Sequence, residues 1–172
     1  GGSEKARPAV IDPIRTRRSV RSFLDRPVER EKLLSLVDAA RMAPSAENEQ
    51  HWRFIIADDP HVLGEFVPAV CGGIYRPTLW MASAPAVIAM VSRIKVKSHY
   101  LGAAVQKIPF HAVDIGIAGE HMVLQARSMG LGTCWVGWFN RKKAERFFRV
   151  GRGKRVLSLL AVGYPDPSKR PR

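Results

Sequence analysis

Cysteine is scarce in this sequence: Cys71 and Cys134 are the only two among 172 residues, and they lie far apart. Without a CxxC pair, neither a disulfide framework nor a structural zinc site is expected. Reduced thiols of this kind fit a cytoplasmic protein, which is where we expect the chain to function.

Long hydrophobic runs are missing as well. No apolar run reaches the roughly 18 to 20 residues that cross a bilayer, and the N-terminus lacks the basic and then apolar pattern of a secretory signal. No membrane partner is therefore expected. We interpret residues 1–11 as an N-terminal arm, with Gly1 to Ser3 as a cloning remnant.

Negative charge is in short supply. The chain has 15 acidic residues against 28 lysines and arginines, which gives a formal net charge of +13. Such an excess favours an anionic partner through the summed field of the surface. Three classes of partner follow: nucleic acid, anionic lipid, or a phosphorylated small molecule.

Several catalytic motifs are also absent. The five histidines show no HExxH or paired spacing, so no metal site is expected, and His121 is more typical of a hydrogen-bonded core histidine. No GxSxG elbow is present. Gly151 to Lys154 (GRGK) precedes Arg155 where a phosphate loop needs Ser or Thr, so we interpret it as a turn.

The remaining composition predicts one folded domain over residues 12–172. With 46% hydrophobic residues, a chain of this length can bury a sizeable core. No internal repeat, low-complexity tract or linker interrupts it.

Helical and strand patterns alternate along the chain. Asp12 as N-cap and Pro13 at the first helical position predict a short helix that ends in an arginine cluster, and a second helix is expected over residues 29–42, before Pro44. Runs rich in β-branched and aromatic residues predict strands at 52–57, 85–91, 133–139 and 155–162. Further helical patterns lie near residues 60–70, 76–83, 110–129 and 141–148. This alternation predicts an α+β fold, or a three-layer α/β/α sandwich.

The helix expected at 110–129 is apolar around most of its circumference. Such a helix must be buried, and Gly116 and Gly119 would allow another backbone to approach closely. One side could pack on the sheet and another against a second subunit. We favour this homodimer by roughly two to one over a central core helix in a monomer.

Arginines are concentrated near both ends of the chain. The stretch RTRRSVRSF spans residues 15–23, and Lys169, Arg170 and Arg172 close the sequence. Basic termini are often solvated tails, but arginine and serine together supply the donors that grip a phosphate. A single phosphomonoester would account for both clusters.

Five motifs in register carry a resemblance to a known family. They are RTRRSVRSF, then APSAENEQHWRF at 43–54, DIGIAGEHMVLQA at 114–126, GLGTCWVG at 130–137 and the closing GYP at 163–165. In order and spacing the sequence resembles the nitroreductase family of FMN-dependent flavoproteins, from about residue 12 to the end. The resemblance implies a three-layer sandwich with a mixed, mostly antiparallel sheet, and a homodimer with FMN at the subunit interface.

The resemblance also implies cofactor-binding residues. The FMN phosphate and ribityl chain would be held by Arg17, Arg18 and Ser19, with Arg170 and Arg172. Arg21 would face the N1/O2 edge of the flavin, where a fixed cation stabilises the negative charge of the reduced ring. Pro44, Ser45, Ala46 and Asn48 match the segment that reaches the flavin from the partner subunit, and Trp135, Val136 and Gly137 match the strand end near N5 and O4.

Some residues depart from the family pattern. Ala46 stands where a second serine is common, and His51 replaces a proline. Tyr75 and Thr78 replace an Asn and a Lys that contact the flavin, which could weaken FMN binding. The short segment 92–109 implies a more open flavin face.

The implied activity is hydride transfer from NADH or NADPH through FMN to a small planar acceptor such as a nitroaromatic or quinone, by a ping-pong mechanism. No proton-shuttling side chain is expected to be essential. One alternative is a flavin-binding protein with little turnover, which acts as a reservoir or sensor or belongs to a dehydrogenating or flavin-degrading branch. Nucleic-acid binding is not expected, because no RNA- or DNA-binding motif accompanies the basic charge.

Overall fold

The elements of the fold follow the predicted order. The computed structural model describes residues 10–94 and 108–169. Most of the predicted N-terminal arm, most of segment 92–109, Arg170 and Arg172 lie outside the described residues. In chain order the elements are α1 (Ile11–Thr16), α2 (Arg30–Arg41), η1 (Ala46–Asn48), β1 (Trp52–Ala57), α3 (Pro60–Cys71), η2 (Gly73–Ser83), β2 (Ala86–Arg93), α5 (Phe110–Ser128), β3 (Gly132–Val136), α6 (Arg141–Phe147) and β4 (Lys154–Gly163).

The predicted boundaries are confirmed to within a few residues, with one correction at the first helix. α1 begins at Ile11, and Val10 is its N-cap without a side-chain hydrogen bond. Asp12 is therefore not the cap but lies in the first turn, where its charge complements the helix dipole. The segment predicted as helical near 76–83 is a 3₁₀-helix that begins earlier, at Gly73.

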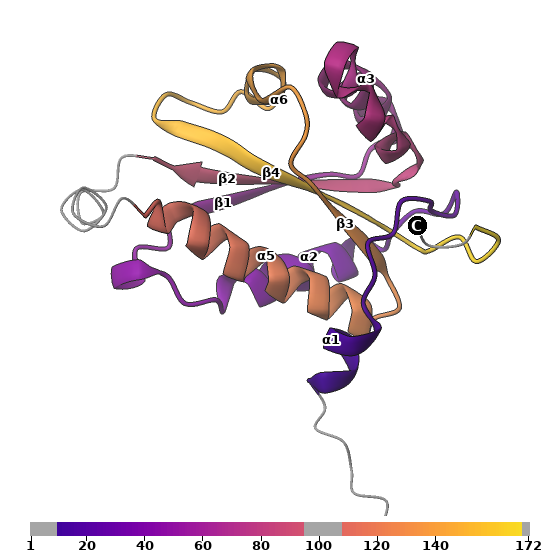
Figure 1. Cartoon of the computed structure of the whole chain (residues 1–172), viewed down its shortest axis with the longest axis horizontal. Helices are drawn as coiled ribbons and strands as arrows, with labels where there is room; N and C mark the ends of the chain where they lie inside the picture. The colour runs from indigo at the N-terminus through magenta and orange to yellow at the C-terminus, as the bar shows by residue number, and fades with distance from the viewer. Residues whose placement is uncertain (1–9, 95–107, 170–172) are drawn as a thin grey trace, which may run out of the picture.

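The four strands form one sheet in the order β1-β2-β4-β3, and each neighbouring pair is antiparallel. The parallel component expected of a mixed sheet is confined, in the described residues, to the bridge between Ser19 and Thr133. Helices cover both faces, with α3 and α6 on one side and α2 and α5 on the other (Figure 1). The three-layer α/β/α sandwich is confirmed.

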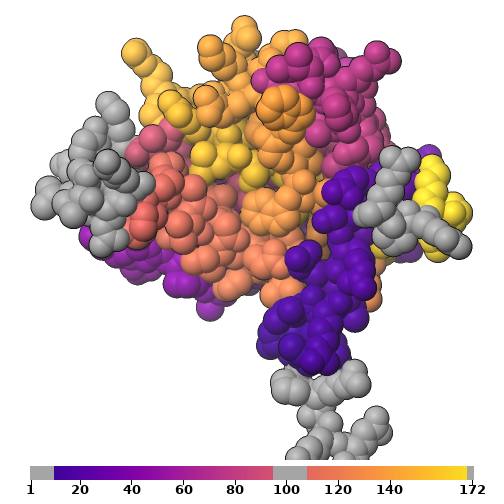
Figure 2. All heavy atoms as spheres, in the orientation of Figure 1, coloured from indigo at the N-terminus to yellow at the C-terminus, as the bar shows by residue number. Residues whose placement is uncertain are grey.

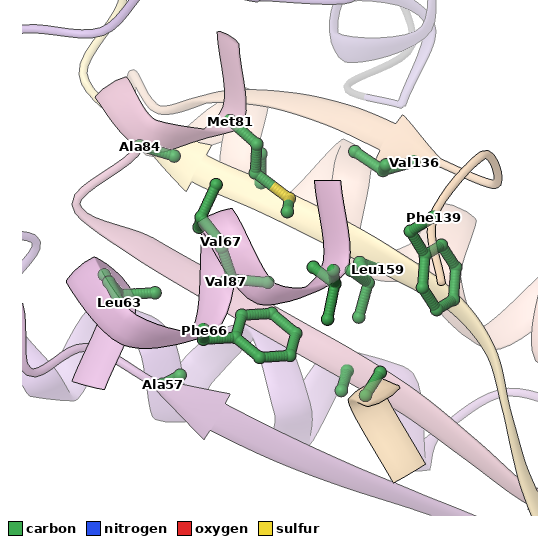
Figure 3. Close-up of a cluster of buried hydrophobic side chains, with 14 of the residues drawn as sticks. Ala57, Leu63, Phe66, Val67, Met81, Ala84, Val87, Val136, Phe139 and Leu159 are labelled. Atoms are coloured by element: carbon green, nitrogen blue, oxygen red, sulfur yellow. The ribbon is translucent and has the colours of Figure 1, made fainter. Parts of the chain in front are cut away.

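Two hydrophobic clusters hold the layers together. The central strand β2 is buried from Ala86 to Ser92, because helices pack on both of its faces. Above the sheet, Phe66 of α3 packs over Val87 and Leu159 (Figure 3). Below it, α2 and α5 bury Leu33, Leu36 and Met122 against the opposite face. The core therefore fixes the position of the end of β3, where Trp135 and Val136 of the predicted site lie.

Gly119 of α5 makes room for a side chain rather than for another backbone. A Cβ at this position would lie 2.2 Å from Cη2 of Trp135 and 2.6 Å from its Cζ2. The indole of this β3 residue therefore packs directly on the α5 backbone. Around Gly116, by contrast, no atom lies within 4 Å of a Cβ.

We expect Gly119→Ala to lower the free energy of unfolding by about 1 to 3 kcal/mol, because Trp135 must shift within a packed core. Gly64→Ala is the matched control: Gly64 lies within the exposed face of α3 with nothing within 4 Å. It should raise stability by up to about 1 kcal/mol through helix propensity. Urea denaturation of both variants measures the contrast, and equal effects would contradict it.

The outward face of α5 is not buried in a single chain, which corrects the expectation of a helix covered all round. Val113 is 47% exposed, and Ile117 and Leu124 are half-buried. In Figure 2 side chains of α5 form part of the visible surface beside the segment that follows α1. An apolar strip on the central helix is thus left for another surface to cover.

No helix in the described ranges is long and apolar enough to span a membrane.

A polar cluster ties the end of β4 to the start of α2. The Tyr164 hydroxyl donates to Glu29, the Lys32 ammonium lies 2.7 Å from the Tyr164 oxygen, and the Arg26 guanidinium stacks 4.0 Å from the ring centre. The Tyr164 hydrogen bond, followed by a backbone hydrogen bond, lowers the pKa of Glu29 from 4.5 to about 2.

Acid should weaken the fold through Glu29. Its folded-state pKa lies below the unfolded value, so its stabilisation is present above about pH 4.5 and is lost as the pH falls toward 2. Melting temperatures of the wild type and Glu29→Gln, measured from neutral to acid pH, should converge across that window. A difference that stays constant with pH would contradict this role.

Candidate functional site

The arginine cluster lies on extended chain beside β3. α1 ends at Thr16, and the backbone N–H of Val20 donates to the Thr133 carbonyl at 2.9 Å. Arg17, Arg18 and Ser19 are all exposed. The predicted placement of these residues at the end of a short helix is confirmed, and the pairing with β3 fixes the backbone that carries them.

The arginine cluster contacts the C-terminal half of α5 through Arg17. Arg17 Nε lies 3.1 Å from Glu120 Oε1, and Arg18 donates to the carbonyls of Arg15 and Arg17. Arg127 Nε donates to Thr16 at 2.8 Å and lines a cavity of about 250 Å³ together with Arg17 and Arg18. Arg127 is a third cation at this site that sequence reasoning missed, because only the pairing of α1 with α5 brings it there.

Arg21 lines a different cavity. Its guanidinium lies 5.9 Å from the centre of the Trp80 ring, and both residues line a cavity of about 550 Å³ with Ser83 and Lys169. Val20 and Pro165 line both this cavity and the one at Arg17. The two predicted contact points, for phosphate and for ring, are therefore adjacent but separated by these apolar side chains.

The end of β3 lies beside a third cavity, in addition to those lined by Arg17 and by Arg21. Trp135 is half-buried and Val136 is buried, whereas Gly137 is exposed and lines a cavity of about 510 Å³ with Tyr75 and Trp138. Burial raises the pKa of the neighbouring Cys134 thiol, which disfavours the thiolate form.

Tyr75 and Thr78 are engaged in packing against the turn after β3. The Thr78 hydroxyl lies 2.7 Å from the Tyr75 carbonyl oxygen and 3.1 Å from that of Trp138. The Trp138 indole N–H donates to Ile74 at 3.0 Å, and the rings of Tyr75 and Trp138 lie 5.2 Å apart. These two departures from the family pattern thus connect η2 to the turn at Gly137.

The predicted partner-facing segment lies elsewhere in the chain. Its backbone is unusual: Glu47, Asn48 and Gln50 have positive φ, and the Gln50 N–H donates to Ser45 Oγ. Pro44 and Asn48 are exposed, while Ser45 and Ala46 are half-buried. An exposed loop held in strained conformations by surrounding contacts is typical of a binding segment.

A buried polar network holds this segment to α5. The carboxylate of Asp114 accepts from the Ala46 N–H at 3.2 Å and from His51 Nε2 at 2.9 Å, and His51 Nδ1 lies 2.9 Å from Ser92 Oγ. All three residues are at least 96% buried. In the sequence, this network was indicated only by an acid inside an apolar helix, Asp114, and by a histidine before a tryptophan-led strand, His51.

Within one chain, the predicted partner-facing segment and the arginine cluster lie far apart. Ala46 is attached at Asp114, near the start of α5, whereas the arginine cluster contacts Glu120 and Arg127. At 1.5 Å per residue, Asp114 and Arg127 are about 20 Å apart along the helix.

Among the residues the structure describes, no group of three or more His, Cys, Asp or Glu side chains could hold a metal.

Comparisons with known proteins identify the fold and its relatives. The chain is 31% identical over 160 residues to a protein of Archaeoglobus fulgidus provisionally named NADH dehydrogenase/NAD(P)H nitroreductase, covering 91% of this chain and 85% of the relative. It is 30% identical over 177 residues to an FMN reductase [NAD(P)H] of Bacillus subtilis, covering 95% and 69%.

Solved structures agree with these relatives. A nitroreductase family protein of Clostridium novyi superposes with a TM-score of 0.81 at 27% identity, covering 94% of this chain and 87% of that chain. An FMN-dependent nitroreductase of Clostridium difficile gives a TM-score of 0.76 at 26% identity, covering 94% and 91%. The family model for nitroreductases matches residues 14–164, and the chain therefore belongs to the nitroreductase family.

Proposed function

We propose that this protein is an FMN-dependent NAD(P)H oxidoreductase that works as a homodimer. The observation that carries the proposal is the gathering of Arg17, Arg18 and Arg127 around one cavity beside β3. Guanidiniums recognise phosphate through paired hydrogen bonds, and these three offset the two negative charges of a phosphomonoester even with Arg17 paired to Glu120. The names of the relatives from Bacillus subtilis and Clostridium difficile point to the same cofactor.

The remaining predicted contacts extend from this phosphate site. Ser19 would assist Arg17 and Arg18, and Arg21 would place a fixed positive charge at the N1/O2 edge of the ring. Trp135, Val136 and Gly137 would present backbone groups to its N5 and O4 side. Tyr75 and Thr78 are occupied with packing, so the ring depends mainly on these backbone contacts.

A second subunit would complete the site. Pro44, Ser45, Ala46 and Asn48 lie at the opposite end of α5 from the arginine cluster, so a twofold dimer would let each protomer supply them to its partner's cofactor. The apolar strip of Val113, Ile117 and Leu124 is available for that contact. Size-exclusion chromatography with light scattering tests the dimer.

Bound FMN would supply the redox chemistry, by accepting hydride from NADH or NADPH and passing it to a planar acceptor such as a nitroaromatic or quinone in a ping-pong cycle. The chain's own residues would bind the phosphate, orient the ring and fix its charge environment. No side chain is assigned a proton transfer.

A flavin-binding protein with little turnover is the second candidate, favoured by the engagement of Tyr75 and Thr78. Titration of the protein with FMN, followed by fluorescence quenching, tests the cofactor. Addition of NADH or NADPH then separates the candidates: loss of the yellow absorbance supports the oxidoreductase, and yellow protein that neither donor bleaches supports the second. A colourless protein that ignores added FMN contradicts both.

A further inference from the structure

Three cations from neighbouring strands line a cavity at one end of the sheet. Arg53 comes from β1, Arg93 from the end of β2 and Lys154 from the start of β4, and the cavity has a volume of about 280 Å³. This end of β2 and β4 lies at the left of Figure 1. The cavity shares no lining residue with the three cavities of the candidate flavin site.

The strand register places these cations side by side. Arg93 and Lys154 are direct cross-strand partners, so their Cβ atoms are about 4.5 to 5.5 Å apart. Arg53 pairs with Val91, two residues before Arg93, and is therefore its diagonal neighbour on the same face of the sheet. Like charges directly opposite each other destabilise a sheet.

Within residues 10–94 and 108–169, no ion pair with a carboxylate offsets this repulsion. None of the ion pairs in the described residues involves Arg53, Arg93 or Lys154. The sequence around them lacks acids as well: residues 66–113 contain no Asp or Glu, and neither do residues 146–165. The sheet thus carries a local cluster of positive charge that no ion pair among the described residues compensates.

We propose that this cavity is a phosphate-binding site. A cluster of three cations matches a phosphate dianion or a pyrophosphate better than a single carboxylate, and guanidiniums bind phosphate oxygens in pairs. The volume of about 280 Å³ accommodates one or two phosphate groups. Buried His51 and Val91, with half-buried Trp52, form the remaining walls, so the cations are backed by a fixed surface.

The position of the cavity indicates a source for the phosphate. His51 and Trp52, which line it, directly follow the 44–50 segment that would reach the partner's flavin. The diphosphate or the 2′-phosphate of the NAD(P)H donor is therefore the favoured source, and free phosphate or pyrophosphate is the other. This assignment of the source rests on the proposed function, whereas the phosphate site does not.

Calorimetric titration with sodium pyrophosphate tests the site without any flavin. The full chain carrying Arg17→Ala and Arg18→Ala is the starting protein, so that the proposed FMN phosphate site does not compete. In this background Arg93→Gln/Lys154→Gln should weaken pyrophosphate binding at least about tenfold, since each charge-assisted contact is worth about 1.5 to 3 kcal/mol. The matched control is Lys143→Gln/Arg146→Gln, which removes the same charge from exposed positions of α6.

The ligand-free melting temperature gives a second readout. Removing Arg93 and Lys154 should leave it unchanged or raise it, because the cross-strand repulsion disappears. Pyrophosphate should raise the melting temperature of the protein that retains both cations and leave that of the Gln variant unchanged. Equal pyrophosphate affinity in the Gln variant, or an equal loss in the α6 control, would overturn the proposal.

Steady-state kinetics in the chain with intact Arg17 and Arg18 then identify the source. A higher KM for NADPH alone assigns the 2′-phosphate, and a higher KM for both NADPH and NADH assigns the diphosphate. Unchanged KM values together with weakened pyrophosphate binding assign a free phosphorylated ligand. If a short oligonucleotide binds through these residues and pyrophosphate does not, the site is a nucleic-acid surface and the proposal is wrong.

Discussion

Replacing Arg17 and Arg18 together by alanine is expected to weaken FMN binding by about 3 kcal/mol, a factor of about a hundred. Each charge-assisted contact to a phosphate is worth about 1.5 to 3 kcal/mol, and we take the lower end because both side chains are exposed and partly screened. Arg127 should hold part of the affinity that remains. Fluorescence quenching of FMN measures the dissociation constant.

A carboxylate beside the site provides a test in the opposite direction. Glu120 forms an ion pair with Arg17 at 3.1 Å, so it competes with the phosphate for that guanidinium. Glu120→Gln should tighten FMN binding by up to about tenfold. The control Arg30→Ala/Arg41→Ala removes two exposed, acid-paired guanidiniums of α2 and should have little effect.

An unchanged FMN dissociation constant in the Arg17→Ala/Arg18→Ala variant would contradict the assignment of these arginines to the FMN phosphate.

The strands and helices were predictable because local chemistry marks their ends. The run Trp52 to Ala57 lies between polar segments and contains β-branched and aromatic residues, and it forms β1 without change. α2 was equally clear from its apolar spacing. The first helix was placed two residues late, since Asp12 resembles an N-cap although its side chain caps nothing.

Contacts between segments that are distant in the sequence could not be predicted from such local patterns. Arg127 reaches the arginine cluster across 111 residues, and Gly119 accommodates Trp135 rather than a second backbone. Arg93 and Lys154 face each other only because a bulge after Met90 shifts the register of β2 against β4. Single residues carry no signal of such pairings, which depend on how the layers stack.

Among the contacts between segments distant in the sequence, the network of His51, Asp114 and Ser92 has the largest expected effect on the free energy of unfolding. We expect His51→Ala to lower the free energy of unfolding by about 3 to 5 kcal/mol, because it removes the ring nitrogen that lies 2.9 Å from the buried carboxylate of Asp114 and pairs with it. The Ala46 N–H would be the only remaining donor to that carboxylate among the contacts described above. Urea denaturation measures the loss, and Asp38→Ala, which breaks an exposed pair with Arg41, should cost less than about 1 kcal/mol.

A second substitution separates the buried charge from lost packing. Asp114→Asn in the His51→Ala background removes the uncompensated charge while its amide oxygen can still accept from Ala46. If the charge dominates, the double variant should be more stable than His51→Ala alone, because an unpaired amide costs less to bury than an unpaired carboxylate. If packing dominates, the double variant should be no more stable, and the electrostatic account of the network fails. Because the same carboxylate holds the 44–50 segment, His51→Ala should also weaken FMN binding in the dimer, and Asp38→Ala should not.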